Sequence, residues 1–165
     1  MMIAETLLQE LEQEARTTRR VLERVPDAHL DWRPHAKSYS LGQLALHVAQ
    51  IPGGVATLAM QSPATPPAFV QERARRSADL VPALEDSVET ARSVLAGASD
   101  ATMMETWRLV AGDRELMAMP RAAFLRAIML NHWYHHRGQL VVYLRQLEVP
   151  VPSVYGPSAD ENPFV

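Results

Sequence analysis

Apolar residues recur at alternating steps of three and four in four long stretches of this chain, and that spacing limits the fold more than any other feature. Residues spaced in this way lie on one face of an α-helix. We expect helices over residues 7–25, 41–60, 79–96 and 120–147. Amphipathic helices of this length bury their apolar faces against one another. The sequence therefore predicts an all-α, four-helix up-down bundle with at least one long crossover connection.

The starts of the first two predicted helices carry capping signals. Thr6 with Gln9, and Ser40 with Gln43, have the spacing of a capping box at a helix N-terminus. Pro52 and the two glycines after it should kink or interrupt the second helix, because proline removes a backbone donor. The helix can nevertheless continue beyond them.

The periodicity changes between residues 104 and 119. Residues 106–109 alternate polar and apolar side chains, Ala111-Gly112-Asp113 is a turn signal, and residues 116–119 supply a return strand. This pattern predicts a small β-hairpin before the last helix, which Pro120 opens at a first-turn position. The tail from residue 149 contains four prolines and should be ordered only if it packs back over the bundle.

Composition excludes several classes of protein. With 165 residues, the chain is expected to form a single domain that spans residues 1–165. The 16 Lys and Arg against 19 Asp and Glu give a net charge of −3, which offers nucleic acid no general attraction. No apolar run is long enough to cross a membrane, and the acidic N-terminus does not match a signal peptide. We therefore expect a cytoplasmic protein that binds neither nucleic acid nor membranes.

The absence of cysteine decides which metal and thiol chemistry is open to the chain. It excludes disulfides, thiolate metal ligands and a nucleophilic thiol of the protein itself. A metal site must therefore use nitrogen and oxygen ligands, and any reacting thiol must arrive as a separate molecule.

Three histidines are the candidate metal ligands: His47, His132 and His136. His132 and His136 are four residues apart on the last predicted helix, so their rings share one face, while His47 lies beside the apolar stripe of the second helix. A lone core histidine more often bonds a backbone carbonyl, and His135 is an alternative to His136. Three such histidines together favour one divalent ion with a coordination position left for water or substrate. Imidazole suits zinc, nickel, iron and copper, and the spacing does not choose among them.

Other catalytic signatures are absent. A zinc-protease helix has Glu directly after its first histidine, and here that position is Trp133. His29 and His35 lie in a loop beside prolines, where we expect surface residues. The residues that could instead transfer a proton are Tyr134, His135, Tyr155, Asp160 and Glu161.

Several segments together resemble the DinB/YfiT-like family of four-helix metal-binding proteins. The matching residues are Trp32-Arg33-Pro34, Ser40, Leu44 and His47 in the first half, and Met119-Pro120-Arg121, Asn131-His132, His135 to Leu140, Tyr143-Leu144-Arg145, Val149 to Pro152 and Tyr155 to Glu161 in the second. The likeness covers nearly the whole chain and is weakest over residues 60–100.

The resemblance implies a four-helix bundle, often dimeric, in which His47, His132 and His136 hold one divalent ion. We expect zinc, nickel or iron as that ion, and the sequence does not determine which. Family relatives include S-transferases and an isomerase that use a low-molecular-weight thiol. The preferred hypothesis is therefore a homodimeric, metal-dependent thiol S-transferase that acts on a small molecule. A hydrolase acting through metal-bound water and a non-catalytic metal-binding stress-response protein are the alternatives.

Overall fold

The computed structural model describes residues 2–68 and 70–164. Its long helices are α1 (Ile3–Leu22), α2 (Leu41–Ala59), α3 (Leu80–Ala96) and α6 (His132–Gln146). Between α3 and α6 lie α4 (Asp100–Met104), the strands β1 (Thr106–Ala111) and β2 (Arg114–Pro120), α5 (Arg121–Phe124) and the π-helical segment η3 (Leu125–Asn131). Two short 3-10 turns, η1 (Asp27–His29) and η2 (Ser77–Asp79), precede α2 and α3.

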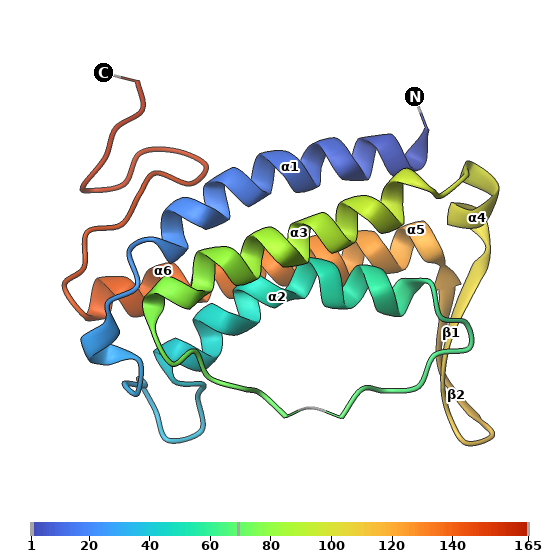
Figure 1. Ribbon diagram of the computed structural model, residues 1–165, viewed down its shortest axis with the longest axis horizontal. Helices are drawn as coiled ribbons and strands as arrows, with labels where there is room; N and C mark the ends of the chain where they lie inside the picture. Colours follow the sequence, from blue (N-terminus) through green and yellow to red (C-terminus); the bar gives the residue numbers. More distant parts are fainter. Residues whose placement is uncertain (1, 69, 165) are drawn as a thin grey trace.

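The long helices form a bundle whose chain direction does not simply alternate. In Figure 1, α2 and α3 run in one direction, while α1 and the continuous α5–η3–α6 helix run in the other. Residues 60–68 and 70–79 belong to the crossover that returns the chain from the end of α2 to the start of α3. The predicted helical bundle with a crossover, and with a hairpin before the last helix, is confirmed.

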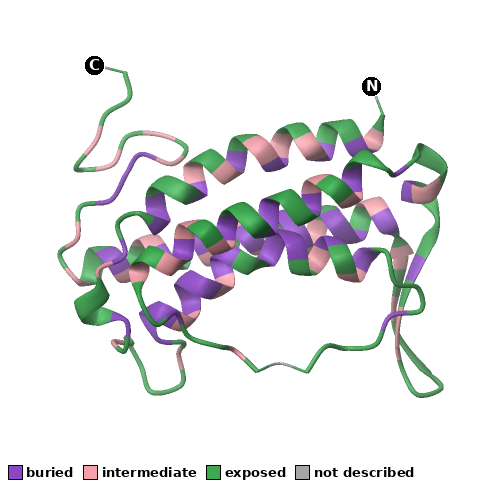
Figure 2. Cartoon of the chain, viewed as in Figure 1, coloured by how far each residue is buried: buried purple, intermediate pink, exposed green. Residues whose placement is uncertain are grey.

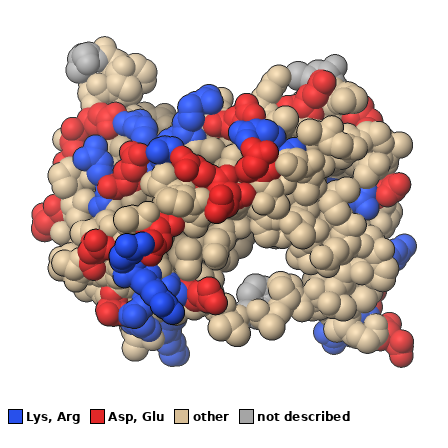
Figure 3. All heavy atoms as spheres, in the orientation of Figure 1, with Lys and Arg blue, Asp and Glu red and all other residues tan. Residues whose placement is uncertain are grey.

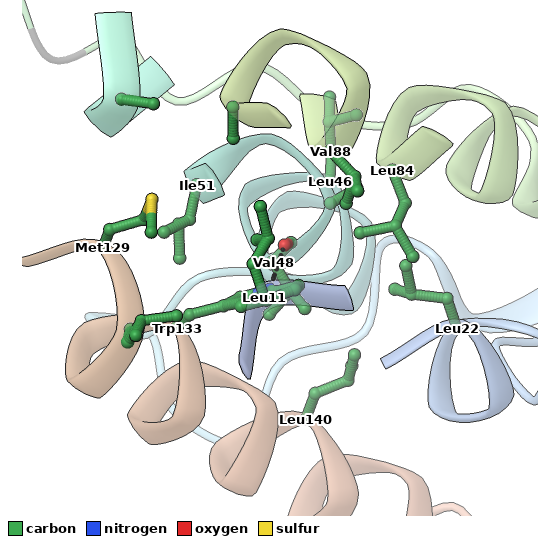
Figure 4. Packing of buried hydrophobic residues seen from close by; sticks show 14 of the residues in the cluster. Leu11, Leu22, Leu46, Val48, Ile51, Leu84, Val88, Met129, Trp133 and Leu140 are labelled. Carbon is green, nitrogen blue, oxygen red and sulfur yellow. Dashed lines mark hydrogen bonds between the residues drawn. The ribbon is translucent and has the colours of Figure 1, made fainter. Parts of the chain in front are cut away.

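The apolar faces predicted from the spacing meet in a buried cluster. Figure 2 shows buried residues on the sides of the helices that face one another and exposed residues on the outer sides. Leu11, Val48 and Trp133, from α1, α2 and α6, belong to this cluster and lie close together in Figure 4. Burying a side chain of this size stabilises the fold by about 1.5–3 kcal/mol, so the inward stripes hold the bundle together. Among the described residues, no helix combines the length and the apolarity needed to cross a bilayer.

The two predicted capping boxes have different outcomes. At the start of α2, the Gln43 backbone N–H donates to Ser40 Oγ (3.2 Å), and the Ser40 N–H donates to Gln43 Oε1 (2.9 Å), as expected. The box at Thr6 is wrong, because α1 already begins at Ile3. The Met2 N–H donates to a Glu5 carboxylate oxygen (2.9 Å), and this contact lets the helix start one turn earlier.

Of the kink or interruption predicted at Pro52, an interruption does not occur, because α2 continues to Ala59 as the sequence also allowed. Proline lacks the N–H that would bond the Val48 carbonyl four residues earlier. The indole Nε1–H of Trp133 donates to that carbonyl instead (2.8 Å), and α6 thereby supplies the missing donor. The next residue, Gly53, donates its N–H to Ser87 Oγ of α3 (2.8 Å). Side chains from two neighbouring helices therefore satisfy the backbone of α2 around the proline.

This arrangement predicts a specific coupling between Trp133 and Pro52. Trp133→Phe should lower the free energy of unfolding by about 1–3 kcal/mol beyond its packing loss, because the buried Val48 carbonyl loses its donor. In a Pro52→Ala background the restored N–H can bond this carbonyl, so the same substitution should cost less. Urea unfolding of the two single variants and the double variant measures the difference. Equal costs of Trp133→Phe in both backgrounds would contradict the explanation.

The hairpin closes one end of the bundle. β1 pairs antiparallel with β2, and Gly112 has the positive φ of 60° that its turn requires. Trp107 of β1 is fully buried and stacks on Phe124 with ring centroids 3.8 Å apart. The crossover is attached to the hairpin through Ala64, which donates to the Arg108 carbonyl (2.8 Å) and accepts from the Val110 N–H (2.9 Å).

The tail packs back against the bundle. The sequence predicted that it would be ordered only in this arrangement. Val151 and Ser153 are buried, and Arg20 of α1 donates to the Ser153 carbonyl (3.2 Å). Asp160 accepts from the Val151 N–H (2.9 Å) and pairs with Arg145 of α6. The prolines thus shape a segment that polar contacts fasten to α1 and α6.

Candidate metal centre

The three candidate histidines converge although 85 residues separate His47 from His132. His47 lies in the middle of α2, while His132 and His136 occupy the first residue and the second turn of α6. One ring nitrogen from each lies within 4.8 Å of the other two, and the ring centroids are 4.5–5.3 Å apart. These rings are close enough to share one ion.

Hydrogen bonding within the group leaves ring nitrogens that a cation would satisfy. Gln139 Oε1 lies 2.8 Å from His136 Nδ1, which therefore carries the proton and leaves the His136 Nε2 lone pair free. That Nε2 lies 2.8 Å from His132 Nε2. If His132 donates across this contact, its buried Nδ1 is an acceptor, and this atom has no hydrogen-bond partner among the described residues. If it does not donate, two lone pairs face each other. A shared cation removes both conflicts, so the donor set fits a divalent ion.

The surroundings of the three imidazoles keep them neutral, which is the form that binds metal ions. Burial, followed by the neighbouring His136 and His132, lowers the pKa of His47 from 6.5 to about 4. Burial is also the largest cause of the lowered pKa values of His132 and His136. All three rings are therefore neutral near pH 7, as metal ligation requires.

A π-helical segment precedes the first histidine of α6. In an α-helix each four-residue step rotates the side-chain direction by about 40°, so a series spaced by four drifts around the helix. The turns of η3 are wider than those of an α-helix. Phe124, Ile128 and His132, spaced by four across this segment, line the same cavity. The sequence did not reveal this segment, because its pattern of apolar residues does not distinguish a π-helical turn from an α-helical one.

The cavity extends from the histidines toward the hairpin and has a volume of about 600 Å³. His47 and His132 lie at one end, and Trp107 and Phe124 lie at the other. Its walls come from α2, η3, the hairpin and the crossover segment 65–67. Sequence reasoning missed this cavity, because residues far apart in the chain assemble it.

The remaining candidates are not members of this group, although the His135 ring centroid lies 5.0 Å from that of His136. His135 is exposed and outside the group, so the structure favours His136 over the alternative pair, and His29 and His35 are exposed as predicted. The proposed proton-transfer residues have other partners. Tyr134 bonds Glu10, Tyr155 bonds Glu14 and Arg137, Asp160 pairs with Arg145, and Glu161 pairs with Arg20. Gln139, which orients His136, received no individual role from the sequence, although an amide one turn after a histidine was a usable signal.

Comparison with known protein families covers both helices that carry the histidines. Residues 1–162 match the sequence pattern of the DinB family. The chain belongs to the DinB family. Because the match covers almost its whole length, both histidine-bearing helices fall inside it.

Relatives of known sequence or structure agree with the family assignment. The uncharacterised YrdA of Bacillus subtilis (strain 168) is 26% identical over 163 residues, covering 93% of this chain and 89% of that protein. A DinB-like protein from Bacillus cereus ATCC 10987 superposes with a TM-score of 0.70 at 22% identity, covering 92% of this chain and 97% of the other. The DinB-like YjoA of Bacillus subtilis gives 0.69 at 17% identity, with coverages of 90% and 96%. At these identities the solved structures show a shared DinB fold.

Proposed function

We propose that this protein is a metal-dependent thiol S-transferase that joins a low-molecular-weight thiol to an electrophilic small molecule. The observation that carries the proposal is the convergence of three neutral imidazoles, without a carboxylate in the group, at the end of an uncharged cavity. Sites with three protein ligands leave a position for an exchangeable ligand, which is typical of catalytic ions.

His47, His132 and His136 would hold the ion, and each has a supporting contact. Gln139 fixes the tautomer of His136, while the Trp133–Val48 hydrogen bond joins the residues adjacent to His132 and His47 and sets α6 against α2. A divalent ion bound there would supply a Lewis acid that favours the deprotonated form of a thiol or water. The sulfur would then attack the electrophilic carbon, forming a C–S bond, while the leaving group departs with the bonding pair and the thiol proton passes to solvent.

The surroundings of the histidines favour a thiol over a water as nucleophile. A thiol has a pKa of about 8.5 in solution and needs little help to ionise near neutral pH. Water needs a far larger shift and usually a positioned base. Tyr134 is no such base, because burial and the bond to Glu10 raise its pKa, and Asp160 and Glu161 are paired with arginines.

The test is a thiol panel assayed with 1-chloro-2,4-dinitrobenzene, using untagged protein loaded separately with Zn²⁺, Ni²⁺ or Fe²⁺. We expect metal-dependent formation of the thioether with at least one small thiol, and its loss in His136→Ala. His135→Ala is the matched control and should keep the activity. Ester hydrolysis without thiol would support the hydrolase instead. Stoichiometric metal without any turnover would support a non-catalytic metal-binding protein.

Metal binding should depend on pH in a direction set by the lowered pKa values. In the unfolded chain His47 takes up its proton near pH 6.5, but in the folded protein its pKa is about 4. Protonation of the folded site competes with ligation, and the pKa values of all three histidines lie below 6.5, so metal affinity should be level above pH 6.5 and fall below it, with His47 protonated last, near pH 4. The metal-free protein should lose stability over the same window, because its unfolded state binds the additional proton. Equilibrium dialysis and urea unfolding from pH 4 to 8 measure both, and a metal affinity already falling between pH 8 and 7 would contradict the assignment.

A further inference from the structure

The cavity beside the three histidines has a property that metal binding does not require. None of the residues that line it is Asp, Glu, Lys or Arg. Its volume of about 600 Å³ lies in the range that encloses a small organic ligand. Its polar side chains other than the histidines are those of Gln50, Thr57, Gln61 and Thr65, and all four residues are exposed. The polar side chains other than the histidines therefore belong to exposed residues, and most of the remaining lining is apolar.

The far end of the cavity is fixed in place. Trp107 is fully buried, stacks on Phe124 and donates its Nε1–H to the Leu58 carbonyl of α2 (3.2 Å). The crossover wall is attached to the hairpin by the backbone bonds of Ala64. Such a preformed wall needs little ordering when a ligand binds.

The lining also determines which ligands the cavity rejects. Apart from an ion held by the histidines, an anion that entered would meet no cationic side chain in the lining, so its lost hydration would cost several kcal/mol. Charged side chains cluster over α1 and α3 in Figure 3, whereas the surface where the crossover meets the hairpin is mostly uncharged. A polyanionic ligand is therefore a poor fit, and an uncharged, apolar one is a good fit.

We propose that this cavity binds the electrophilic substrate, and that this substrate is an uncharged, mainly apolar small molecule. Its reacting end would face His47 and His132, and its apolar body would lie against Trp107 and Phe124. That the ligand is a substrate rests on the proposed function, but binding of a ligand to the cavity can be measured without the metal.

The probe is N-phenyl-1-naphthylamine, an uncharged dye, compared with 8-anilino-1-naphthalenesulfonate, which adds a sulfonate to the same skeleton. Fluorescence titration of the full chain should show the uncharged dye binding at least about tenfold more tightly. Gly54→Leu, at a cavity position where an added Cβ meets nothing within 4 Å, should weaken the dye about tenfold. Val55→Phe fills the cavity from an adjacent position and should also weaken dye binding. Gly138→Leu, equally open but on α6 outside the cavity, should bind as the wild type does.

The dye measurements decide whether the cavity binds an uncharged ligand. Thermal melting confirms that every variant is folded. Absence of dye binding, equal binding of the anionic dye, or unchanged binding in both cavity variants would overturn it. His136 does not line the cavity, so His136→Ala should lose metal but bind the dye normally. Dye binding without metal-dependent thiol transfer would refute the proposed function alone. Thiol transfer without the expected dye selectivity would refute the cavity assignment alone.

Discussion

Replacing His132 with alanine should release the divalent ion from the purified protein, whereas replacing His135 should leave the metal content unchanged. His132 is one of three imidazoles whose nitrogens lie within 4.8 Å of one another, and its neighbour His135 is exposed and outside that group. Changing a residue that only supports a ligand typically weakens metal binding about 10–100-fold, so removing the ligand should cost more than about 100-fold. Metal analysis of untagged protein after dialysis against a weak chelator measures the effect.

A third variant, with an intermediate expected effect, tests this expectation more strictly. Gln139→Ala keeps all three imidazoles but frees the His136 tautomer, so it should weaken binding by about 10–100-fold, between the wild type and His132→Ala. Near-identical melting temperatures of the metal-free proteins would show that the variants are folded. Stoichiometric metal in His132→Ala, or equal losses in His132→Ala and His135→Ala, would exclude the three-histidine centre.

Local signals in the sequence predicted the bundle and the candidate ligands. The spacing of apolar residues depends only on helix geometry, and Ser40 with Gln43 act within one helical turn, so both were readable from the chain. Their inward faces then placed His47 and His132 near each other, because a histidine beside an apolar stripe points toward the neighbouring helices.

Features that depend on contacts between distant segments were not predictable in this way. The persistence of α2 through Pro52 depends on Trp133, which lies 81 residues further along the chain. Helix propensity accounts for the N–H that proline lacks, but it does not predict the indole N–H that replaces it. The cavity was hidden for the same reason, since Trp107 and the crossover meet α2 only in three dimensions.

The buried Arg137 of α6 gives the largest expected effect on stability. Its guanidinium lies 2.6 Å from a Glu14 carboxylate oxygen of α1, and the two side chains are only 2% and 6% exposed. It also donates to Thr18 Oγ1 (3.0 Å) and to the Tyr155 hydroxyl of the tail (2.5 Å), and that hydroxyl donates to Glu14 (2.9 Å). Arg137→Met should lower the free energy of unfolding by about 3–5 kcal/mol, because it leaves the Glu14 carboxylate buried without a cationic partner.

The double variant Glu14→Leu with Arg137→Met separates this explanation from a simple loss of packing. It removes both charges and retains apolar side chains of similar length, so much of the stability lost in Arg137→Met should return. Urea unfolding of the wild type, both single variants and the double variant forms a complete cycle. If the double variant loses the sum of the two single losses, the uncompensated charge is not the cause.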